Sequence, residues 1–300
     1  MWFWFSLAAL FCWSGSDLFS KTGCVGEDKY SHLKMITAVG TVMGIHAVFE
    51  LLSGNASISL AEFLKYLPVS CIYILSMALG YIGLRYIELS VSSPICNSSG
   101  AIVAILCLIT GTGKLSVGQY IAIALICTGV TGLGIVEAAE DETLRAERQN
   151  HANYKYSKSA AAIILPVLYC LLDALGTFSD SIVLETLNEE TANVSYELTF
   201  FFCGAVSFLY VKAIKKQKYI FKKEAKKYLG AVFETAGQFF YIFALADNAH
   251  VAISAPVISS YCLVSVLWGR VFLKEKLSYK HYIMIGIATA GIVISGIFEG

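Results

Sequence analysis

One segment of the chain occurs twice. Residues 91–135 and 253–297 align without a gap. The residues that are identical at matching places include Pro94 and Pro256, Ser98 and Ser260, and Gly129 and Gly291. Each copy has two long apolar stretches joined by a short polar turn, so the repeated unit is a pair of membrane helices and not a solenoid turn. Internal duplication in a membrane protein is typical of transporters, whose two halves move about a site between them.

The composition supports an integral membrane protein. Hydrophobic residues make up 57% of the chain and charged residues 15%, against about 45–50% and about 25% in soluble proteins. A membrane-crossing helix needs about 20 apolar residues. Ten stretches meet this length, which predicts an all-α membrane fold of ten transmembrane helices. They are 2–22, 33–53, 66–87, 92–111, 117–138, 160–184, 195–213, 228–246, 251–273 and 279–298.

The positive charges are distributed unevenly along the chain. Of the 22 Lys and Arg residues, all but Lys65 and Lys114 fall in or beside the odd-numbered loops. The positive-inside rule therefore predicts a multi-pass protein of the cell membrane with the odd-numbered loops in the cytoplasm and both termini outside.

A lysine cluster at 212–227 lies against the ends of two predicted helices. Anionic membrane lipid is the expected partner of such a cluster. A nucleic-acid patch is the weaker interpretation, and no nucleic-acid partner is expected.

The polar segment from Glu137 to Lys158 separates the two halves. We predict a first repeat at 1–138, a linker at 139–159 and a second repeat at 160–300. Five spans in each half give the second repeat the opposite orientation, which predicts an inverted repeat with a pseudo-two-fold axis in the membrane plane. The match extends faintly to the first span of each half, where Phe19-Ser20 corresponds to Phe178-Ser179.

Proline and glycine add local expectations. Pro94 and Pro256 lie near the starts of the fourth and ninth spans, where proline is tolerated, so a place in the first helical turn is expected. The alternative is a hinge or a bent helix that lines a cavity. Gly40 and Gly44 in the second span, and glycines such as Gly129 in the fifth, are expected to let helices approach closely.

Several ionisable or polar side chains lie within the predicted spans, where a charge costs about 2.5–3.5 kcal/mol. Spacings of four and seven residues place each set on one face of its helix, as a cavity wall requires. The acids outnumber the bases. The candidate residues for substrate binding or proton coupling are Trp13, Asp17, His46, Glu50, Tyr81, Asn97, Asp173, Asp180, Glu234, Gln238, Tyr241 and Tyr261.

Structural explanations compete with function at these positions. For Asp17, Glu50 and Asp180, which lie near helix ends, solvation or interhelical hydrogen bonding is an equal alternative. His46, Asp173 and Gln238 lie nearest the centres of their spans, which favours function. Serines beside Asn97 and Tyr261 can instead bond to the backbone. The aromatic residues either form a cage for a cation or pack against neighbouring helices.

Catalytic templates are absent from the sequence. It has no HExxH, GxSxG, P-loop or CxxC pattern, and the spacing of His46 and Glu50 supplies too few ligands for zinc. We therefore expect no enzymatic activity and no metal or cofactor. Without an ATP-hydrolysing motif, uphill transport would need an ion gradient or exchange.

The duplicated stretch resembles the EamA family of the drug/metabolite transporter superfamily. Both copies have a proline entering a helix, a short turn and an aliphatic-glycine helix. The turn reads Leu273-Lys274-Glu275-Lys276-Leu277-Ser278 in the second copy and Gly111-Thr112-Gly113-Lys114-Leu115-Ser116, without the acid, in the first. The opening Phe11-Cys12-Trp13-Ser14-Gly15-Ser16 is also similar to the start of family members.

The resemblance implies a basket of ten helices around a cavity formed by the first, third, fourth, sixth, eighth and ninth spans. It also implies export or exchange of small metabolites such as amino acids, or import of organic cations. Family members are described with cytoplasmic termini, whereas the count of Lys and Arg here favours the reverse, which we adopt.

Together these features predict a secondary active transporter of a small polar metabolite such as an amino acid or organic cation. The substrate would enter a central acidic cavity, and transport would be coupled to protons or another gradient. The alternative is a non-transporting scaffold or sensor. Ten helices form a complete pathway in one chain, which makes a monomer possible.

Overall fold

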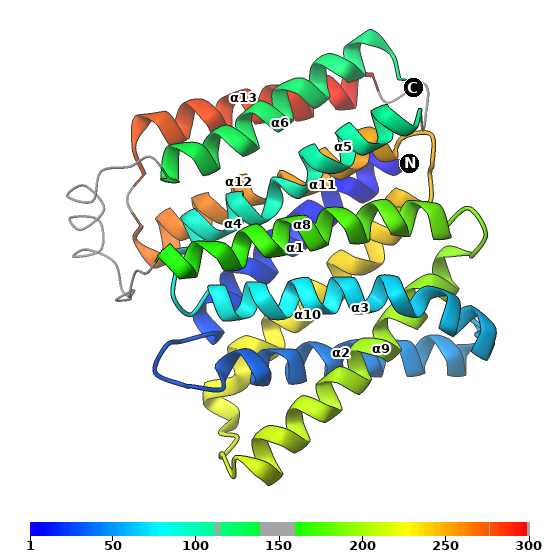
Figure 1. Ribbon diagram of the computed structural model, residues 1–300, viewed down its shortest axis with the longest axis vertical. Helices are drawn as coiled ribbons and strands as arrows, with labels where there is room; N and C mark the ends of the chain where they lie inside the picture. Colours follow the sequence, from blue (N-terminus) through cyan, green and yellow to red (C-terminus); the bar gives the residue numbers. More distant parts are fainter. Residues whose placement is uncertain (112–114, 139–159, 276, 299–300) are drawn as a thin grey trace.

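The computed structural model describes residues 1–111, 115–138, 160–275 and 277–298. The predicted linker 139–159 lies outside these residues. The described residues form helices and connecting turns, which confirms the all-α fold. Nine of the helices described are long and apolar enough to cross a membrane. Helix α1 (Trp2–Gly23) has a similar length and lies among them (Figure 1).

The first half continues with the helices α2, α3, α4, α5 and α6, whose bounds are Ser31–Ser53, Leu60–Gly83, Leu89–Asn97, Ser99–Thr110 and Val117–Ala138. The second half has α8, α9, α10, α11, α12 and α13, whose bounds are Ala160–Val183, Glu189–Leu209, Phe221–Leu245, Val251–Ser259, Tyr261–Trp268 and Tyr279–Ile297. Two π-helical turns, η1 (Tyr210–Ile214) and η2 (Gly269–Leu273), extend α9 and α12.

Helices of the two halves interleave. The most extensive contacts join α1 to α10, α3 to α8, α2 to α9 and α6 to α13. The broken helices meet in the same way, α5 against α11 and α4 against α12. Under the inverted repeat, α2 corresponds to α9 and α6 to α13, and these counterparts pair directly. Helices α1 and α3 correspond to α8 and α10, and each of them pairs with the counterpart of the other. The two repeats therefore form one helical body around the pseudo-two-fold axis.

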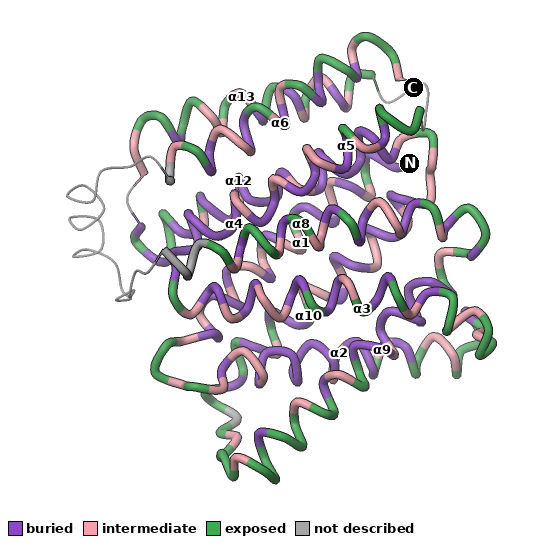
Figure 2. Tube along the Cα trace, viewed as in Figure 1, coloured by how far each residue is buried: buried purple, intermediate pink, exposed green. Residues whose placement is uncertain are grey.

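The ends of the molecule differ. Both termini lie at one end together with the turns at 54–59, 184–188 and 246–250, while the turns at 24–30, 84–88 and 215–220 lie at the other (Figure 1). We call the end with the turns at 24–30, 84–88 and 215–220 the basic end, because these turns carry Lys and Arg residues. The broken helix α11–α12 lies near the centre of the molecule, and 72% of the residues in its apolar stretch are buried (Figure 2). Helix α13 lies at the periphery, and 22% of the residues in its apolar stretch are buried.

Three helices begin earlier than hydropathy predicts. Helix α3 begins at Leu60 instead of 66, α9 at Glu189 instead of 195, and α10 at Phe221 instead of 228. Each of them has charged side chains among its first residues, and two of the three, α3 and α9, are capped. Ser59 forms a capping box with Glu62, and the Asn188 side chain accepts the Thr191 N–H. Hydropathy detects the apolar part of a span and misses such polar turns.

The expected position of the two repeated prolines in first helical turns is wrong. Pro94 lies inside α4 and Pro256 inside α11, and each helix breaks a turn later, at Ser98 and at Ser260. Each proline also supplies no N–H to the turn before it, so the helix lacks a hydrogen bond on that side of the break as well. The bent, cavity-lining helix is the correct alternative for both copies.

Glycines bring the paired helices close, as expected. A Cβ at Gly40 would lie 2.5 Å from the Phe200 carbonyl oxygen across the contact between α2 and α9. A Cβ at Gly129 would lie 2.5 Å from Ala288, where α6 meets α13. Side chains at these positions would push the helix pairs apart.

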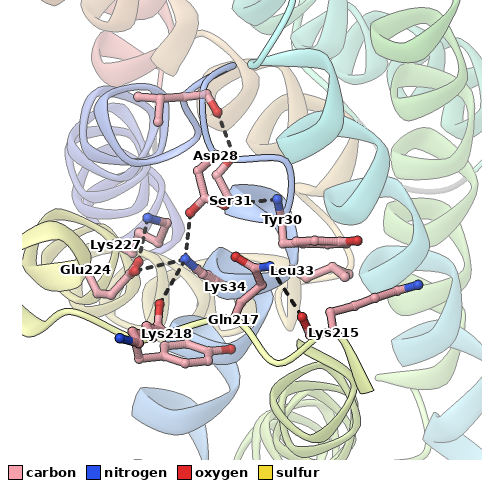
Figure 3. A network of polar contacts seen from close by, with 12 residues as sticks. Asp28, Tyr30, Ser31, Leu33, Lys34, Lys215, Gln217, Lys218, Glu224 and Lys227 are labelled. Atoms are coloured by element: carbon pink, nitrogen blue, oxygen red, sulfur yellow. Dashed lines mark hydrogen bonds and ion pairs between the residues drawn. The ribbon is translucent and has the colours of Figure 1, made fainter. Parts of the chain in front are cut away.

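A network of ion pairs joins α2 to α10 at the basic end (Figure 3). Lys34 Nζ lies 2.7 Å from Asp28 Oδ2 and 3.3 Å from Glu224 Oε1, and Glu224 also pairs with Lys227 at 2.6 Å. Burial alone would raise the pKa of Asp28, but hydrogen bonds from Lys34 and from the Tyr30 N–H hold this pKa below its ordinary value. Lys227 is buried in this network, so it is not available to the lipid surface expected for the cluster at 212–227.

Candidate functional site

A cavity lies between the two halves. Its walls come from α1, α3, α4, α5, α8, α10, α11 and α12, with Tyr196 added from α9. These are the six spans that the family resemblance implied, together with one residue of a seventh. The space between the walls, open solvent included, is about 950 Å³.

Three carboxylates line this cavity. Asp17 lies on α1, Asp173 on α8 and Glu234 on α10. The lining contains no Lys, Arg or His among the described residues. The cavity therefore carries an excess of negative charge over positive charge whenever any of these acids is ionised.

A serine from another helix orients each carboxylate. Asp17 Oδ2 accepts hydrogen bonds from Ser93 at 2.5 Å and Ser265 at 2.7 Å. The Ser99 hydroxyl donates to Asp173 Oδ2 at 2.7 Å. The second oxygen of each aspartate has no hydrogen-bond partner among the described residues. It is left for a ligand or a proton.

Glu234 is held in the same way. The Ser16 hydroxyl of α1 donates to Glu234 Oε2 at 2.7 Å. This bond crosses the contact between α1 and α10, so it fixes the carboxylate at the meeting point of the two halves.

Aromatic rings form a second part of the wall. The Trp13 ring lies 5.0 Å from that of Tyr241 and 5.8 Å from that of Tyr261. A Cβ at Gly237 would lie 2.4 Å from the Trp13 ring, so this glycine makes room for the indole. Aromatic faces beside carboxylates attract a cationic group.

Two hydrogen-bond donors of the wall, Tyr81 Oη and Gln238 Nε2, are buried and have no partner among the described residues. The Trp13 indole N–H faces the Glu234 carboxylate. Buried polar groups are normally hydrogen-bonded, so unused donors in a cavity are available to an acceptor on a ligand. The wall thus offers carboxylates to a cationic group and donors to an anionic or carbonyl group.

The structure brings together nine of the twelve residues proposed from sequence. They are Trp13, Asp17, Tyr81, Asn97, Asp173, Glu234, Gln238, Tyr241 and Tyr261. Asn97 donates from Nδ2 to the Ser93 carbonyl oxygen at 2.8 Å and to the Ser93 hydroxyl, the side chain that also binds Asp17. The functional role of all nine stays a prediction.

His46 and Glu50 do not reach the cavity, contrary to the expectation of a shared polar chamber. His46 Nδ1 lies 2.9 Å from both carboxylate oxygens of Glu197 on α9, and His46 Nε2 lies 3.6 Å from Glu50. The four-residue spacing correctly placed His46 and Glu50 on one face of α2. That face lies against α9, and α2 does not line the cavity.

Asp180 also lies outside the cavity. It is fully buried and accepts a hydrogen bond from Tyr66. The serines that orient the cavity carboxylates were missed, because serines are numerous in these helices and nothing in the sequence distinguishes the four that bond to an acid. Glu197 was missed because it lies near the start of a span that hydropathy placed too late.

Polar contacts also occupy the basic end next to the cavity residues Ser20 and Leu84. The Lys21 ammonium donates to the carbonyl oxygens of Leu84, at 2.5 Å, and Ile87. Glu275, from the turn before α13, accepts the Ser90 N–H at 3.1 Å at the start of α4. Burial raises the pKa of Glu275, and the neighbouring Lys21 opposes that rise.

Comparison with known proteins agrees with this architecture. Residues 160–297 match the model of the EamA-like transporter family. A solved structure, "Crystal structure of protein", has a TM-score of 0.64 and 12% sequence identity, and the match covers 99% of this chain and 96% of that chain. This likeness establishes the fold alone. The curated proteins give no match. The helices of the second half, at residues 160–297, thus match the EamA-like transporter family, which is part of the drug/metabolite transporter superfamily of membrane proteins.

Proposed function

We propose that this protein is a secondary active transporter of a small zwitterionic or cationic metabolite, with amino acids as the leading substrate class. The observation that carries the proposal is the cavity between the inverted halves, which contains three carboxylates and no basic side chain among the described lining residues. Such a site attracts an ammonium group and repels a net anion.

The unpaired donors favour a zwitterion over a simple cation. Tyr81 and Gln238 offer O–H and N–H groups that have no acceptor among the described residues. The carboxylate of an amino acid would satisfy them while its ammonium group faces Asp17, Asp173 or Glu234. A quaternary amine would use the carboxylates and the rings of Trp13 and Tyr241, and would leave the donors unpaired.

The test is ligand-dependent thermal stabilisation of the purified full chain, with amino acids, nucleosides and quaternary amines as probes. A compound that binds only the folded state raises the apparent melting temperature by mass action. We expect amino acids to give the largest rise. Uptake of the radiolabelled best probe into proteoliposomes then tests transport. If no probe stabilises the protein, the transporter proposal fails and a scaffold or sensor becomes the better explanation.

Asp173→Asn tests the role of the cavity carboxylates. The amide still accepts the Ser99 hydrogen bond but carries no charge. A charge-assisted contact is worth about 1.5–3 kcal/mol, so we expect the apparent affinity for the best probe to fall about 10-fold to 100-fold.

Glu50→Gln is the matched control for this variant, because it neutralises an acid of a membrane helix outside the cavity. Its affinity is expected to equal that of the unmodified protein. Equal losses in both variants, or no loss in Asp173→Asn, would remove Asp173 from the substrate site.

A further inference from the structure

Asp180 forms a second polar site directly behind the cavity wall. Its side chain is fully buried and does not line the cavity. Oδ1 accepts a hydrogen bond from the Tyr66 hydroxyl at 2.8 Å. Oδ2 is buried and has no hydrogen-bond partner among the described residues.

The surroundings of Asp180 contain no compensating charge. The titratable side chains that face it are Tyr66 and Tyr73 of α3, Tyr241 of α10 and Tyr196 of α9. No described Lys, Arg or His forms an ion pair with it. An unpaired carboxylate is costly in such a place. A carboxylic acid would avoid that charge and would donate its own proton.

Three hydroxyl groups lie between this carboxyl and the cavity, and two of them, those of Tyr73 and Tyr241, face the Asp180 carboxyl. The Tyr73 hydroxyl is hydrogen-bonded to that of Tyr241, and both bond to Thr177 Oγ1, at 3.1 Å and 3.3 Å. All three residues line the cavity. Each hydroxyl can donate and accept at once. We call Tyr73, Thr177 and Tyr241 the hydroxyl triad.

The inverted repeat places a different group at the corresponding position of the first half. Extending the match of Phe178-Ser179 with Phe19-Ser20 aligns Asp180 with Lys21. Lys21 is engaged by the Leu84 and Ile87 carbonyl oxygens at the basic end. Asp180 lies near the end of α8 that faces the termini, opposite the basic end (Figure 1). At this position of the repeat, the buried acid is therefore a feature of one half only.

We propose that Asp180 is a proton-binding site of the transporter, loaded from and discharged to the cavity through the hydroxyl triad. On discharge, the O–H bond of the carboxylic acid breaks and its proton moves to a triad hydroxyl, while that hydroxyl passes its own proton to water or substrate in the cavity. Loading reverses these steps, and no electrons are transferred. The inference rests on the proposed transport function and assigns its coupling ion.

Infrared difference spectroscopy of the purified full chain tests the site without any substrate. A protonated carboxyl absorbs in the C=O stretching region, and the absorption disappears on ionisation. Between about pH 5 and pH 8, where biological proton switches operate, we expect a titrating carboxylic acid band that is missing from Asp180→Asn. The band should remain in Glu185→Gln, an exposed acid at the same end.

A band that does not titrate in this range, or that persists in Asp180→Asn, would overturn the proposal. The asparagine amide retains an acceptor for the Tyr66 hydroxyl, which favours folding. Unchanged thermal unfolding of this variant would show that loss of the band is not caused by misfolding.

Deuterium exchange tests the hydroxyl triad. After transfer to heavy water, the Asp180 band should shift as its proton is replaced. Thr177→Val removes one hydroxyl with little change in shape and should slow this shift on the order of tenfold, the factor for one lost hydrogen bond. An unchanged exchange rate would exclude the Thr177 hydroxyl from the route and overturn the triad as proposed.

Transport measurements separate the inference from the proposed function. If the Asp180 band titrates but no probe is transported, the proposed function fails and the proton site stands. If an amino acid is transported together with protons, as reported by a pH-sensitive dye inside proteoliposomes, Asp180→Asn should abolish the proton flux. Undiminished proton flux in that variant would overturn the inference while leaving the transport function intact.

Discussion

The three cavity acids share a mode of attachment. A serine hydroxyl from a different helix holds Asp17, Asp173 and Glu234. The acids were recognisable in the sequence because an ionisable group in an apolar span is expensive and needs a reason. Their serine partners were not recognisable, since the partner of each acid comes from a segment far away along the chain.

The same limit applies to His46. Its position near the centre of a span correctly marked an unusual polar group, but a central position does not reveal which neighbour a helix face meets. In the structure His46 meets Glu197. The function expected of His46 as a cavity residue therefore loses its geometric support.

Asp28 gives a prediction about pH. Its lowered pKa means that the folded state favours the carboxylate, so the pair with Lys34 stabilises the protein above the unfolded value of about 3.9. This stability is lost as the pH falls through the lower folded-state pKa. At neutral pH, Asp28→Asn should lower the free energy of unfolding by on the order of 1 kcal/mol, because the pair is partly exposed, and should lower the melting temperature with it.

Thermal unfolding at a series of pH values measures this effect. The difference between the unmodified protein and Asp28→Asn should shrink as the pH is lowered toward 4 and below. Glu27→Gln, at the neighbouring exposed position, should match the unmodified protein throughout. A difference that is constant with pH would show that the carboxylate charge is not the cause.

At the scale of elements, helix contact surfaces give the sharpest test of packing. A Cβ at Gly40 would lie 2.5 Å from the Phe200 carbonyl oxygen, whereas a Cβ at Gly286 on α13 meets nothing within 4 Å. Overpacking costs about 1–3 kcal/mol, so Gly40→Ala should unfold at a clearly lower temperature. Gly286→Ala should be neutral or more stable by up to about 1 kcal/mol, because alanine favours the helix.

Thermal denaturation of both variants in the same detergent checks this prediction. Equal stability of the two variants would mean that α2 and α9 do not approach each other as closely as the structure shows.

Glu275 gives a second test at this scale. Its carboxylate accepts N–H groups from Leu89 and Ser90 at the start of α4. An acid at a helix N-terminus stabilises the unpaired N–H groups and the helix dipole. Glu275→Ala should cost about 0.5–2 kcal/mol, measured by thermal unfolding.

Glu275→Gln retains an acceptor and should recover part of that loss. The two variants separate hydrogen bonding from charge. If alanine and glutamine are both neutral, Glu275 does not cap α4. The acid is missing from the first copy of the turn, so the sequence indicated the asymmetry, but only the structure showed which helix the acid caps.

At the scale of the whole molecule, the orientation in the membrane stays a prediction. The turns at one end carry most of the Lys and Arg, and both termini lie at the opposite end (Figure 1). The positive-inside rule then places the termini outside the cytoplasm. Alkaline phosphatase fused to the C-terminus should be active in bacterial cells, and green fluorescent protein fused there should be dark. Bright fluorescence from the latter would reverse the assignment.

The amino-acid sequence was enough to predict the class of the protein: ten membrane helices, an inverted repeat and a set of acids within the spans. These follow from hydropathy, duplication and charge, which are local or periodic properties of the chain. Helix starts were less accurate, because caps such as Ser59 extend helices beyond their apolar part.

Which polar residues share a space became evident from the packing of the helices. Asp17 and Asp173 lie in one cavity, His46 lies between α2 and α9, and Asp180 lies behind a layer of hydroxyls. The spacing of residues along one helix fixes the face on which each side chain lies. The neighbour of that face depends on how the two halves interleave, and that arrangement is set by packing across the whole molecule.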